Sequence, residues 1–225
     1  VTGVQTCALP IYEIRNPLAA VSHAAQLLSE SDGMTEPDER LITIIRNQSR
    51  RMNGIVENIL QLSRREKSRA DLFELAPWLH HFVDEFKSTP MAEDIELVLD
   101  LADEEIFVIF DQSQLHQTLW KLMENAIDHR GDDDQDLRVT LRLNLDQTAS
   151  HCIITVEDNG PGIPEENIDH VFEPFFTTRA SGTGLGLYIA RQLCDANNAE
   201  ITVDSPPNRA TKFRIRIAIS GPTQQ

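Results

Sequence analysis

The sequence predicts an α+β protein in which a helical hairpin precedes an α/β sandwich. Over the first third of the chain, apolar residues recur at helical spacing. Beyond residue 72, short apolar segments that fit strands alternate with amphipathic segments that fit helices. Helices packed on one side of a mixed sheet form a two-layer sandwich. A chain of 225 residues can hold one such domain of medium size and a small helical one.

The first 11 residues look foreign to this fold. They read VTGVQTCALPI, which has neither helical nor strand periodicity, and they abut a helical motif without a capping residue. This stretch resembles the conceptual translation of a common sequencing-adapter oligonucleotide. We therefore expect residues 1–11 to be non-native, and we exclude them from the predicted fold.

Residues 12–66 are expected to form two antiparallel helices. The first carries one apolar stripe, made of Leu18, Val21, Ala25 and Leu28. The second carries a heptad seam, made of Leu41, Ile45, Gln48, Met52, Ile55, Ile59 and Leu62. Two such helices cannot bury their stripes alone, and two hairpins paired in a homodimeric four-helix bundle can. An ordinary intramolecular helix pair is the alternative.

A charged run then marks a hinge at residues 67–71, and a second domain is expected over residues 72–220, with a tail at 221–225. Its helices are predicted at 75–86, from Asp111 past Ile127, and from Gly184 to about Asn197. Its strands are predicted at 96–99, 106–110, 138–145, 152–157, 200–203 and 212–219. These elements account for the sandwich.

Composition excludes several classes of function. The net charge of −16 argues against a general nucleic-acid or anionic-membrane binder. The three cysteines show no Cys-x-x-Cys spacing, so neither a disulfide framework nor a zinc site is indicated, and a reducing cytoplasm fits best. No run approaches the roughly 18 apolar residues of a membrane span, so we expect any anchor to lie outside these residues.

Two glycine-rich boxes, at residues 158–163 and 182–187, predict a nucleotide site. Asp158 ends an apolar strand, and Gly160 and Gly162 let the backbone approach a ligand. The second box opens a helix at Gly184, whose first N–H groups lack partners and favour an anion such as phosphate. Asp158 would accept a hydrogen bond from an exocyclic amine such as that of adenine. One Gly-x-Gly alone would indicate a turn, but two boxes in order are more specific.

Together with Glu124-Asn125-Ala126, these boxes resemble the catalytic ATP-binding domain of two-component sensor histidine kinases, whose sandwich is of the GHKL type. The resemblance implies ATP and Mg²⁺ as cofactors, with the Asn125 carboxamide oxygen as a Mg²⁺ ligand. The implied nucleotide-binding residues are Asn125, Asp158, Gly160, Gly162, Thr177, Thr178, Arg179, Gly182, Thr183, Gly184, Leu185 and Gly186. The sequence departs from the family at Lys121, where a second asparagine is usual.

Residues 165–181 are expected to form a mobile lid over this site. Phe172, Phe175 and Phe176 would attach its edges to the core, and Phe172 is expected in the core itself. Lid loops with glycine and polar residues are typical gates of active sites.

The segment from Tyr12 to Leu18 resembles the H-box of the same family, in which histidine occupies the place of Tyr12. Glu13 would then be the general base, and Asn16 would position water for dephosphorylation of a partner. Histidine and tyrosine codons differ only in their first base, so we hypothesise that adapter sequence converted a native histidine codon at this position. A genuine Tyr12 in a degenerate kinase is the alternative. A phenol has no free ring nitrogen, so Tyr12 cannot accept phosphate as imidazole does.

The implied function is the kinase core of a sensor histidine kinase, most similar to the nitrogen-regulation and type IV pilus sensors. It would phosphorylate the H-box histidine from Mg-ATP, pass the phosphoryl group to an aspartate of a response regulator receiver domain, and dephosphorylate that partner. No nucleic acid is expected as a partner. We expect this part in the cytoplasm and the full-length protein at the inner or plasma membrane. The alternatives are a GHKL ATPase and a non-catalytic ATP-binding dimeric scaffold.

Overall fold

A computed structural model describes residues 5–30, 35–63, 69–130, 137–179, 182–206 and 210–221. The chain divides into two compact units. The helical unit comprises Val1–Glu66 and Pro174–Leu185, and the sheet unit comprises Lys67–Glu173 and Gly186–Gln225. Each unit is described by itself below.

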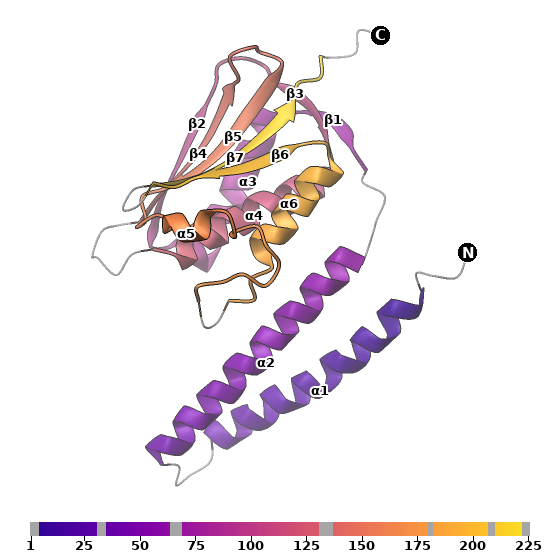
Figure 1. Cartoon of the computed structure of the whole chain (residues 1–225), viewed down its shortest axis with the longest axis vertical. Coiled ribbons are helices and arrows are strands. Elements are labelled where there is room, and N and C mark those ends of the chain that lie inside the picture. The colour runs from indigo at the N-terminus through magenta and orange to yellow at the C-terminus, as the bar shows by residue number, and fades with distance from the viewer. Residues whose placement is uncertain are drawn as a thin grey trace. The chain divides into compact units, whose positions relative to one another are not determined.

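The helical unit contains the predicted hairpin. Helix α1 spans Gln5–Ser29 and helix α2 spans Glu36–Ser63, and the two run side by side (Figure 1). The start of α2 is encoded locally, because Asp38 accepts a hydrogen bond from the Thr35 amide at 3.1 Å and three acidic residues occupy the first turn. No helix within the described ranges is both long and apolar enough to cross a membrane.

Helix α1 begins before the H-box motif, and this corrects one expectation. The backbone of residues 5–11 is helical, whereas we had excluded residues 1–11 from the fold. Ala8 and Leu9 are strong helix formers, whereas Pro10 within the same segment cannot donate a helical hydrogen bond, so local propensity by itself does not account for the helical backbone here. Their helical backbone does not bear on their origin, and the non-native origin of these residues stays a prediction.

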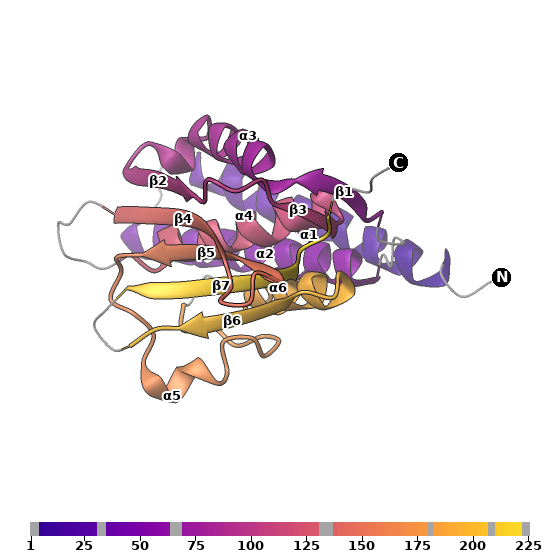
Figure 2. The ribbon, with the colours of Figure 1, turned by 90° about the horizontal axis from the view of Figure 1, so that it is seen from above.

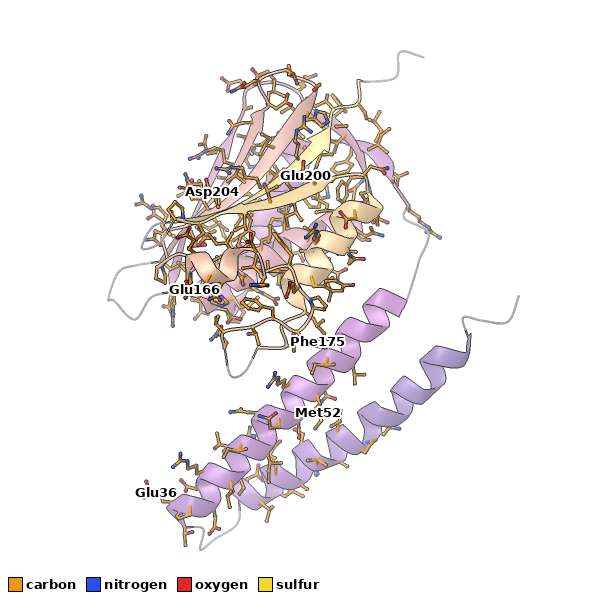
Figure 3. The ribbon with its side chains drawn as sticks, viewed as in Figure 1. Glu36, Met52, Glu166, Phe175, Glu200 and Asp204 are labelled. Carbon is orange, nitrogen blue, oxygen red and sulfur yellow. The ribbon has the colours of Figure 1, made fainter. Side chains whose placement is uncertain are left out.

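The packing of the hairpin uses a different face of α2 from the predicted seam. Among the described side chains of α1 and α2, the buried ones are Leu18, Ala25, Ile42, Ser49 and Val56. Most apolar residues of the predicted stripes are exposed instead, namely Val21, Leu28, Leu41, Ile45 and Met52, the last of which is labelled in Figure 3. Side chains of Ile59 and Leu62 lie outside the described residues. Heptad spacing alone does not say which of two adjacent faces meets the neighbouring helix.

The sheet unit contains a five-stranded mixed sheet in the order β2-β4-β5-β7-β6, which can be followed across Figure 2. Its strands are β2 (Ile95–Leu101), β4 (Leu137–Leu145), β5 (His151–Asp158), β6 (Glu200–Asp204) and β7 (Thr211–Ala218). Strands β2 and β4 are parallel, and the other pairs are antiparallel. Every strand predicted for this sheet is therefore confirmed within a few residues.

Three helices cover one face of this sheet, as Figures 1 and 2 show. They are α3 (Leu75–Lys87), α4 (Gln112–Asp128) and α6 (Gly186–Ala196), while the short α5 (Glu165–Ile168) and a 3₁₀ turn (Pro90–Ala92) lie in connections. A small second sheet pairs β1 (Asp71–Glu74) with β3 (Phe107–Phe110). Strand β1 was not predicted, because its pairing with β3 is a tertiary contact.

Alternation along the strands places the core between the sheet and the helices. On β4, Val139, Leu141 and Leu143 are fully buried, whereas Arg138 and Arg142 lie on the outer face and pair with acidic residues of β2. The core also contains the leucines and phenylalanines of α3 and α4. The sandwich predicted from the sequence is therefore confirmed.

A buried polar network joins the start of α4 to the end of α6. The Asp111 carboxylate caps α4 by accepting from the Ser113 and Gln114 amides at 3.0 and 3.2 Å, and it also accepts from the Arg69 amide at 2.8 Å. Burial alone would raise the pKa of Asp111, but these hydrogen bonds hold it below its ordinary value. Asn197 accepts from the Asp111 amide at 2.9 Å and donates to Gln114 at 2.7 Å. The network holds α4 and α6 in register.

Candidate nucleotide-binding site

The first glycine box fixes a buried carboxylate at the end of β5. Asp158 is 6% exposed, and its Oδ1 accepts a hydrogen bond from the Gly160 amide at 2.9 Å. A Cβ atom on Gly160 would lie 2.8 Å from that oxygen and 3.4 Å from the His129 carbonyl oxygen. Glycine is therefore required here for steric reasons, and the turn holds the carboxylate in one position.

Burial raises the pKa of Asp158, although hydrogen bonds from the Gly160 and Thr211 backbones oppose the shift. A carboxylate kept in an apolar setting interacts more strongly with a ligand donor than it would in water. Asp158 can therefore offer a selective acceptor to an amine, which is the role expected of it.

The rest of this turn is held by a residue that the sequence analysis did not single out for this site. Gly162 has φ +81°, a left-handed conformation that favours glycine. The next amide, of Ile163, donates to the buried Ser205 hydroxyl at 2.7 Å, and that hydroxyl lies 3.1 Å from the Thr211 hydroxyl. Ser205 is 42 residues away from Ile163 along the chain, and no local sequence signal indicates this contact.

Helix α4 presents the candidate metal ligand. Asn125 is half-buried, and the helix ends at His129, which acts as its C-cap and lies with Nδ1 3.0 Å from the Asn125 carbonyl oxygen. Lys121 lies one turn before Asn125, so the two side chains share a face of the helix. Carboxamide oxygen is a ligand that Mg²⁺ accepts. In the described part of the chain, no cluster of three or more His, Cys, Asp or Glu residues could hold a metal ion by itself.

The second glycine box begins its helix later than predicted. Helix α6 starts at Gly186, whereas we expected Gly184. The reason is that Gly184 has φ +68°, which lies outside the right-handed helical region. Leu185 lies between Gly184 and Gly186. Its amide donates to the Thr183 hydroxyl at 3.4 Å, and its side chain is buried. The first free helical amides therefore follow Gly186.

Phe175 and Gly184 close the base of the lid. The Phe175 amide donates to the Gly184 carbonyl at 2.8 Å, and Phe175 itself has φ 69°. A non-glycine residue rarely adopts this conformation, which costs on the order of 1–3 kcal/mol. A Cβ on Gly184 would overlap the carbonyl carbon of Phe175 and lie 2.6 Å from its oxygen. This contact permits only glycine at position 184.

The aromatic residues of the lid do not all attach to the core, which corrects another expectation. Phe175 is 60% exposed (Figure 3), because its left-handed backbone and its hydrogen bond to Gly184 direct the side chain outward. Phe172 is only half-buried, yet it packs edge-on against Phe213 with ring centroids 6.2 Å apart, and it carries the Arg191 guanidinium 5.7 Å above it. Phe172 therefore belongs to the edge of the core.

The lid turn uses its own polar groups. The Thr177 hydroxyl accepts from the Arg179 amide at 3.1 Å, and the Gly182 amide donates to the Arg179 carbonyl at 3.2 Å. A Cβ on Gly182 would collide with the Thr177 hydroxyl. Thr178 is exposed. Thr177 and Gly182 thus shape the turn itself, a role that the sequence did not reveal.

The H-box residues lie on one helix. Tyr12, Glu13 and Asn16 all belong to α1, and Asn16 is exposed. The side chains of Tyr12 and Glu13 lie outside the described residues. Their spacing along a helix places Tyr12 and Asn16 on the same face.

The fold and the glycine boxes define a helical hairpin joined to an ATP-binding sandwich, and comparisons with known proteins agree. Residues 12–68 match the family "His Kinase A (phospho-acceptor) domain", and residues 110–220 match the family "Histidine kinase-, DNA gyrase B-, and HSP90-like ATPase". Together the two matches account for most of the chain. The chain therefore belongs to the sensor histidine kinases of two-component systems.

Individual relatives support this assignment. The chain is 42% identical over 207 residues to the sensor protein kinase PilS of Pseudomonas aeruginosa, covering 92% of this chain and 39% of that protein. Full-length ShkA in complex with AMPPNP matches the fold with a TM-score of 0.71 and 21% identity, covering 97% of this chain and 46% of that one. ThkA in complex with the response regulator TrrA matches with a TM-score of 0.66 and 24% identity, covering 98% and 63%. The chain spans less than half the length of curated relatives such as PilS.

Gly184→Ala is expected to weaken ATP binding about tenfold or more. The new methyl group clashes with the Phe175 carbonyl and demands a left-handed backbone, so the lid base opens. Trypsin should then cleave after Arg179 faster, as gel electrophoresis would show. Gly221→Ala is the matched control, because a Cβ there meets nothing within 4 Å. Equal cleavage rates in both variants would contradict this role for the Phe175–Gly184 contact.

Proposed function

We propose that this chain is the kinase core of a sensor histidine kinase. It binds Mg-ATP, phosphorylates a histidine at position 12 of the native protein, and passes the phosphoryl group to an aspartate of a response regulator. The observation that carries this proposal is the buried Asp158 carboxylate, held by the Gly160 amide at the end of β5. It supplies a selective acceptor for adenine in a family that binds ATP.

The residues present fit the nucleotide and its metal. Gly160 has no side chain that would clash with the Asp158 carboxylate, so the carboxylate can occupy its position in the turn. Gly162 adopts the left-handed backbone that the same turn requires. Asn125 offers a carboxamide oxygen for Mg²⁺, which when bound would neutralise charge on the phosphates. The amides that follow Gly186 are suited to a phosphate because the helix start leaves them without partners.

The other nucleotide residues belong to the lid. Thr177, Thr178 and Arg179 would reach the γ-phosphate, and the stretch of Gly182, Thr183, Gly184 and Leu185 would place backbone next to the phosphates. The hydrogen bond between the Phe175 amide and the Gly184 carbonyl supports this role. It joins the two ends of the loop, so that the loop between them can move as a unit.

In the helical unit, residues 12–66 would be the dimerisation and phosphotransfer domain, followed by a hinge at 67–71 and the catalytic domain at 72–220. Glu13 would act as general base toward the histidine, and Asn16 would position water in dephosphorylating the response regulator. The family match to residues 12–68 supports the first boundary. The complex of the related ThkA with a response regulator supports this class of partner.

A homodimer is supported by the apolar surface of the hairpin. Leu41, Ile44, Ile45 and Met52 of α2 are all exposed in the single chain. Exposed apolar patches of this kind mark sites of association, and a second hairpin of the same sequence would cover them. We also propose that the full-length protein is anchored in a membrane with this part in the cytoplasm, and the similarity to a sensor protein kinase, PilS, supports this.

Two other functions remain as alternatives. A water-activating ATPase of the same fold uses a glutamate four residues before the metal-binding asparagine, and Lys121 occupies that place here. A non-catalytic dimeric scaffold is favoured only by Tyr12, if that residue is genuine.

Calorimetry with ATP and Mg²⁺ tests the proposal directly. We expect saturable heat with ATP and with ADP, and none with GTP at the same concentration, because the guanine ring presents a carbonyl where adenine presents its amine. The purified chain is suitable, since binding requires no phosphoacceptor. Absence of heat with adenine nucleotides at millimolar concentration would refute the proposed function.

A further inference from the structure

Lys121 is the residue of α4 that departs from the family pattern, and its surroundings give it a specific task. Its side chain is 26% exposed, and its Nζ lies 2.8 Å from Glu124 Oε2. The aliphatic part approaches the start of α6, because a Cβ on Gly186 would lie 3.8 Å from Lys121 Cδ. Lys121 therefore lies between the candidate metal ligand Asn125 and the helix start expected to bind phosphate.

Glu124 holds Lys121 in this position. Its Oε2 pairs with Lys121, and its Oε1 accepts from the Trp120 indole Nε1 at 3.2 Å. Trp120 is itself held by stacking on His116, with ring centroids 5.3 Å apart, and by edge contact with Phe86 at 5.1 Å. The Glu124 carboxylate is thus held by the aromatic packing between α3 and α4. Its ion pair with Lys121 restricts the positions that Lys121 Nζ can occupy.

A lysine and an asparagine differ in what they can bind. The asparagine usual at this position offers a carboxamide oxygen to a divalent cation, whereas an ammonium group repels that cation and donates only to anions. In a half-buried setting, an ammonium attracts a polyphosphate more strongly than it does at an exposed surface. The ion pair with Glu124 keeps the charge balanced while no nucleotide is bound.

We propose that Lys121 is a phosphate-binding residue that supplies positive charge to the phosphates in addition to that of Mg²⁺. This inference rests on the proposed function. Lys121 would then help to set how strongly the site prefers ATP over ADP and adenosine. It would also help to set how far ATP affinity depends on Mg²⁺. On nucleotide binding, Lys121 Nζ shifts its pairing from Glu124 toward a phosphate oxygen.

The test measures dissociation constants of ATP, ADP and adenosine, with Mg²⁺ and with EDTA, by displacement of a fluorescent adenine nucleotide. Lys121→Met keeps the length of the stem and removes the charge. It should weaken ATP binding in EDTA about tenfold or more and leave adenosine within about twofold, because hydrogen bonds to charged groups are among the strongest. Lys121→Arg keeps the charge and should retain most of the affinity for ATP.

Two further variants sharpen the test. Lys121→Asn restores the residue usual in the family, and it should lose affinity in EDTA yet recover much of it in Mg²⁺. Glu124→Gln removes the competing carboxylate and should tighten ATP binding when Lys121 is present but not in the Lys121→Met background, which is a double-mutant cycle. Thermal unfolding of each variant checks that the fold is intact.

The outcomes separate the two proposals. If the unsubstituted chain binds no adenine nucleotide, the proposed function fails and this inference fails with it. If that chain binds ATP and Lys121→Met binds it equally well in EDTA, only the inference is overturned, and Lys121 is merely the counterion of Glu124. Equal losses for ATP and adenosine would also overturn it, because they indicate a structural role.

Discussion

Replacing Tyr12 with histidine is expected to change a protein that takes up no acid-labile phosphate into one that autophosphorylates. The phenol of Tyr12 lacks the free ring nitrogen that attacks the γ-phosphate, whereas the imidazole of histidine is available as a nucleophile at neutral pH. Incubation with γ-labelled ATP and Mg²⁺ should label Tyr12→His only. The label should survive base and disappear in acid, as expected for a phosphorus–nitrogen bond.

Two controls define this result. Tyr12→Phe should stay unlabelled, which excludes a general effect of substitution at this position. Adding Asp158→Asn to Tyr12→His should strongly reduce labelling at limiting ATP, because that variant binds ATP more weakly. If Tyr12→His binds ATP and still remains unlabelled, the assignment of position 12 as the phosphoacceptor is wrong. Steady release of phosphate without label would instead favour the ATPase alternative. Resequencing the locus independently tests whether the native codon specifies histidine.

Asp158→Asn is expected to weaken ATP binding roughly 30- to 100-fold. The substitution removes a buried charged acceptor, and hydrogen bonds to charged groups contribute about 2–3 kcal/mol when they are lost in a buried site. Asparagine can also present its own NH₂ group to the adenine amine, and two donors repel. Calorimetry with Mg-ATP measures the change. Asp204→Asn is the matched control, because Asp204 is an exposed carboxylate at the end of β6 (Figure 3) and its variant should bind ATP normally.

The same Asp158→Asn variant should unfold at an equal or higher temperature than the unsubstituted chain when no ATP is present. Burial raises the pKa of Asp158 above its ordinary value of 3.8, so the ionised group costs stability in the folded state. A raised folded pKa means that the native chain binds the proton more tightly, and stability from this group is lost as pH rises through that pKa. The advantage of Asp158→Asn should therefore be largest at neutral pH and vanish below pH 3.8. A variant that is less stable at neutral pH would contradict this account.

Periodicity and glycine spacing were sufficient for much of the molecule. The hydrophobic pattern predicted α3, α4, α6 and every strand of the large sheet, because burial on one face imposes a period that is visible in the sequence. The cap at Asp111 and the order of the two glycine boxes were equally readable, since both depend on residues close together in the chain. The family assignment followed from those motifs.

Contacts between distant segments were beyond the reach of the sequence. Strand β1 exists because it pairs with β3, and Ser205 supports the Ile163 turn across 42 residues. The face of α2 that meets α1, with Ile42, Ser49 and Val56 buried, was not predicted, because the heptad repeat does not say which of two adjacent faces meets the neighbouring helix. The start of α6 moved to Gly186 because the contact between Gly184 and Phe175 requires a left-handed backbone.

The amino-acid sequence by itself therefore determined the class of fold, the family and the residues available for binding a nucleotide, because local spacing encodes secondary structure and short motifs. Only the tertiary structure decided that Asp158 is buried and held by Gly160, that Phe175 is exposed, and that Lys121 lies between Glu124 and the start of α6. Those properties are burial and contacts between residues that are distant in the sequence. They are fixed only by tertiary packing, which local spacing does not encode.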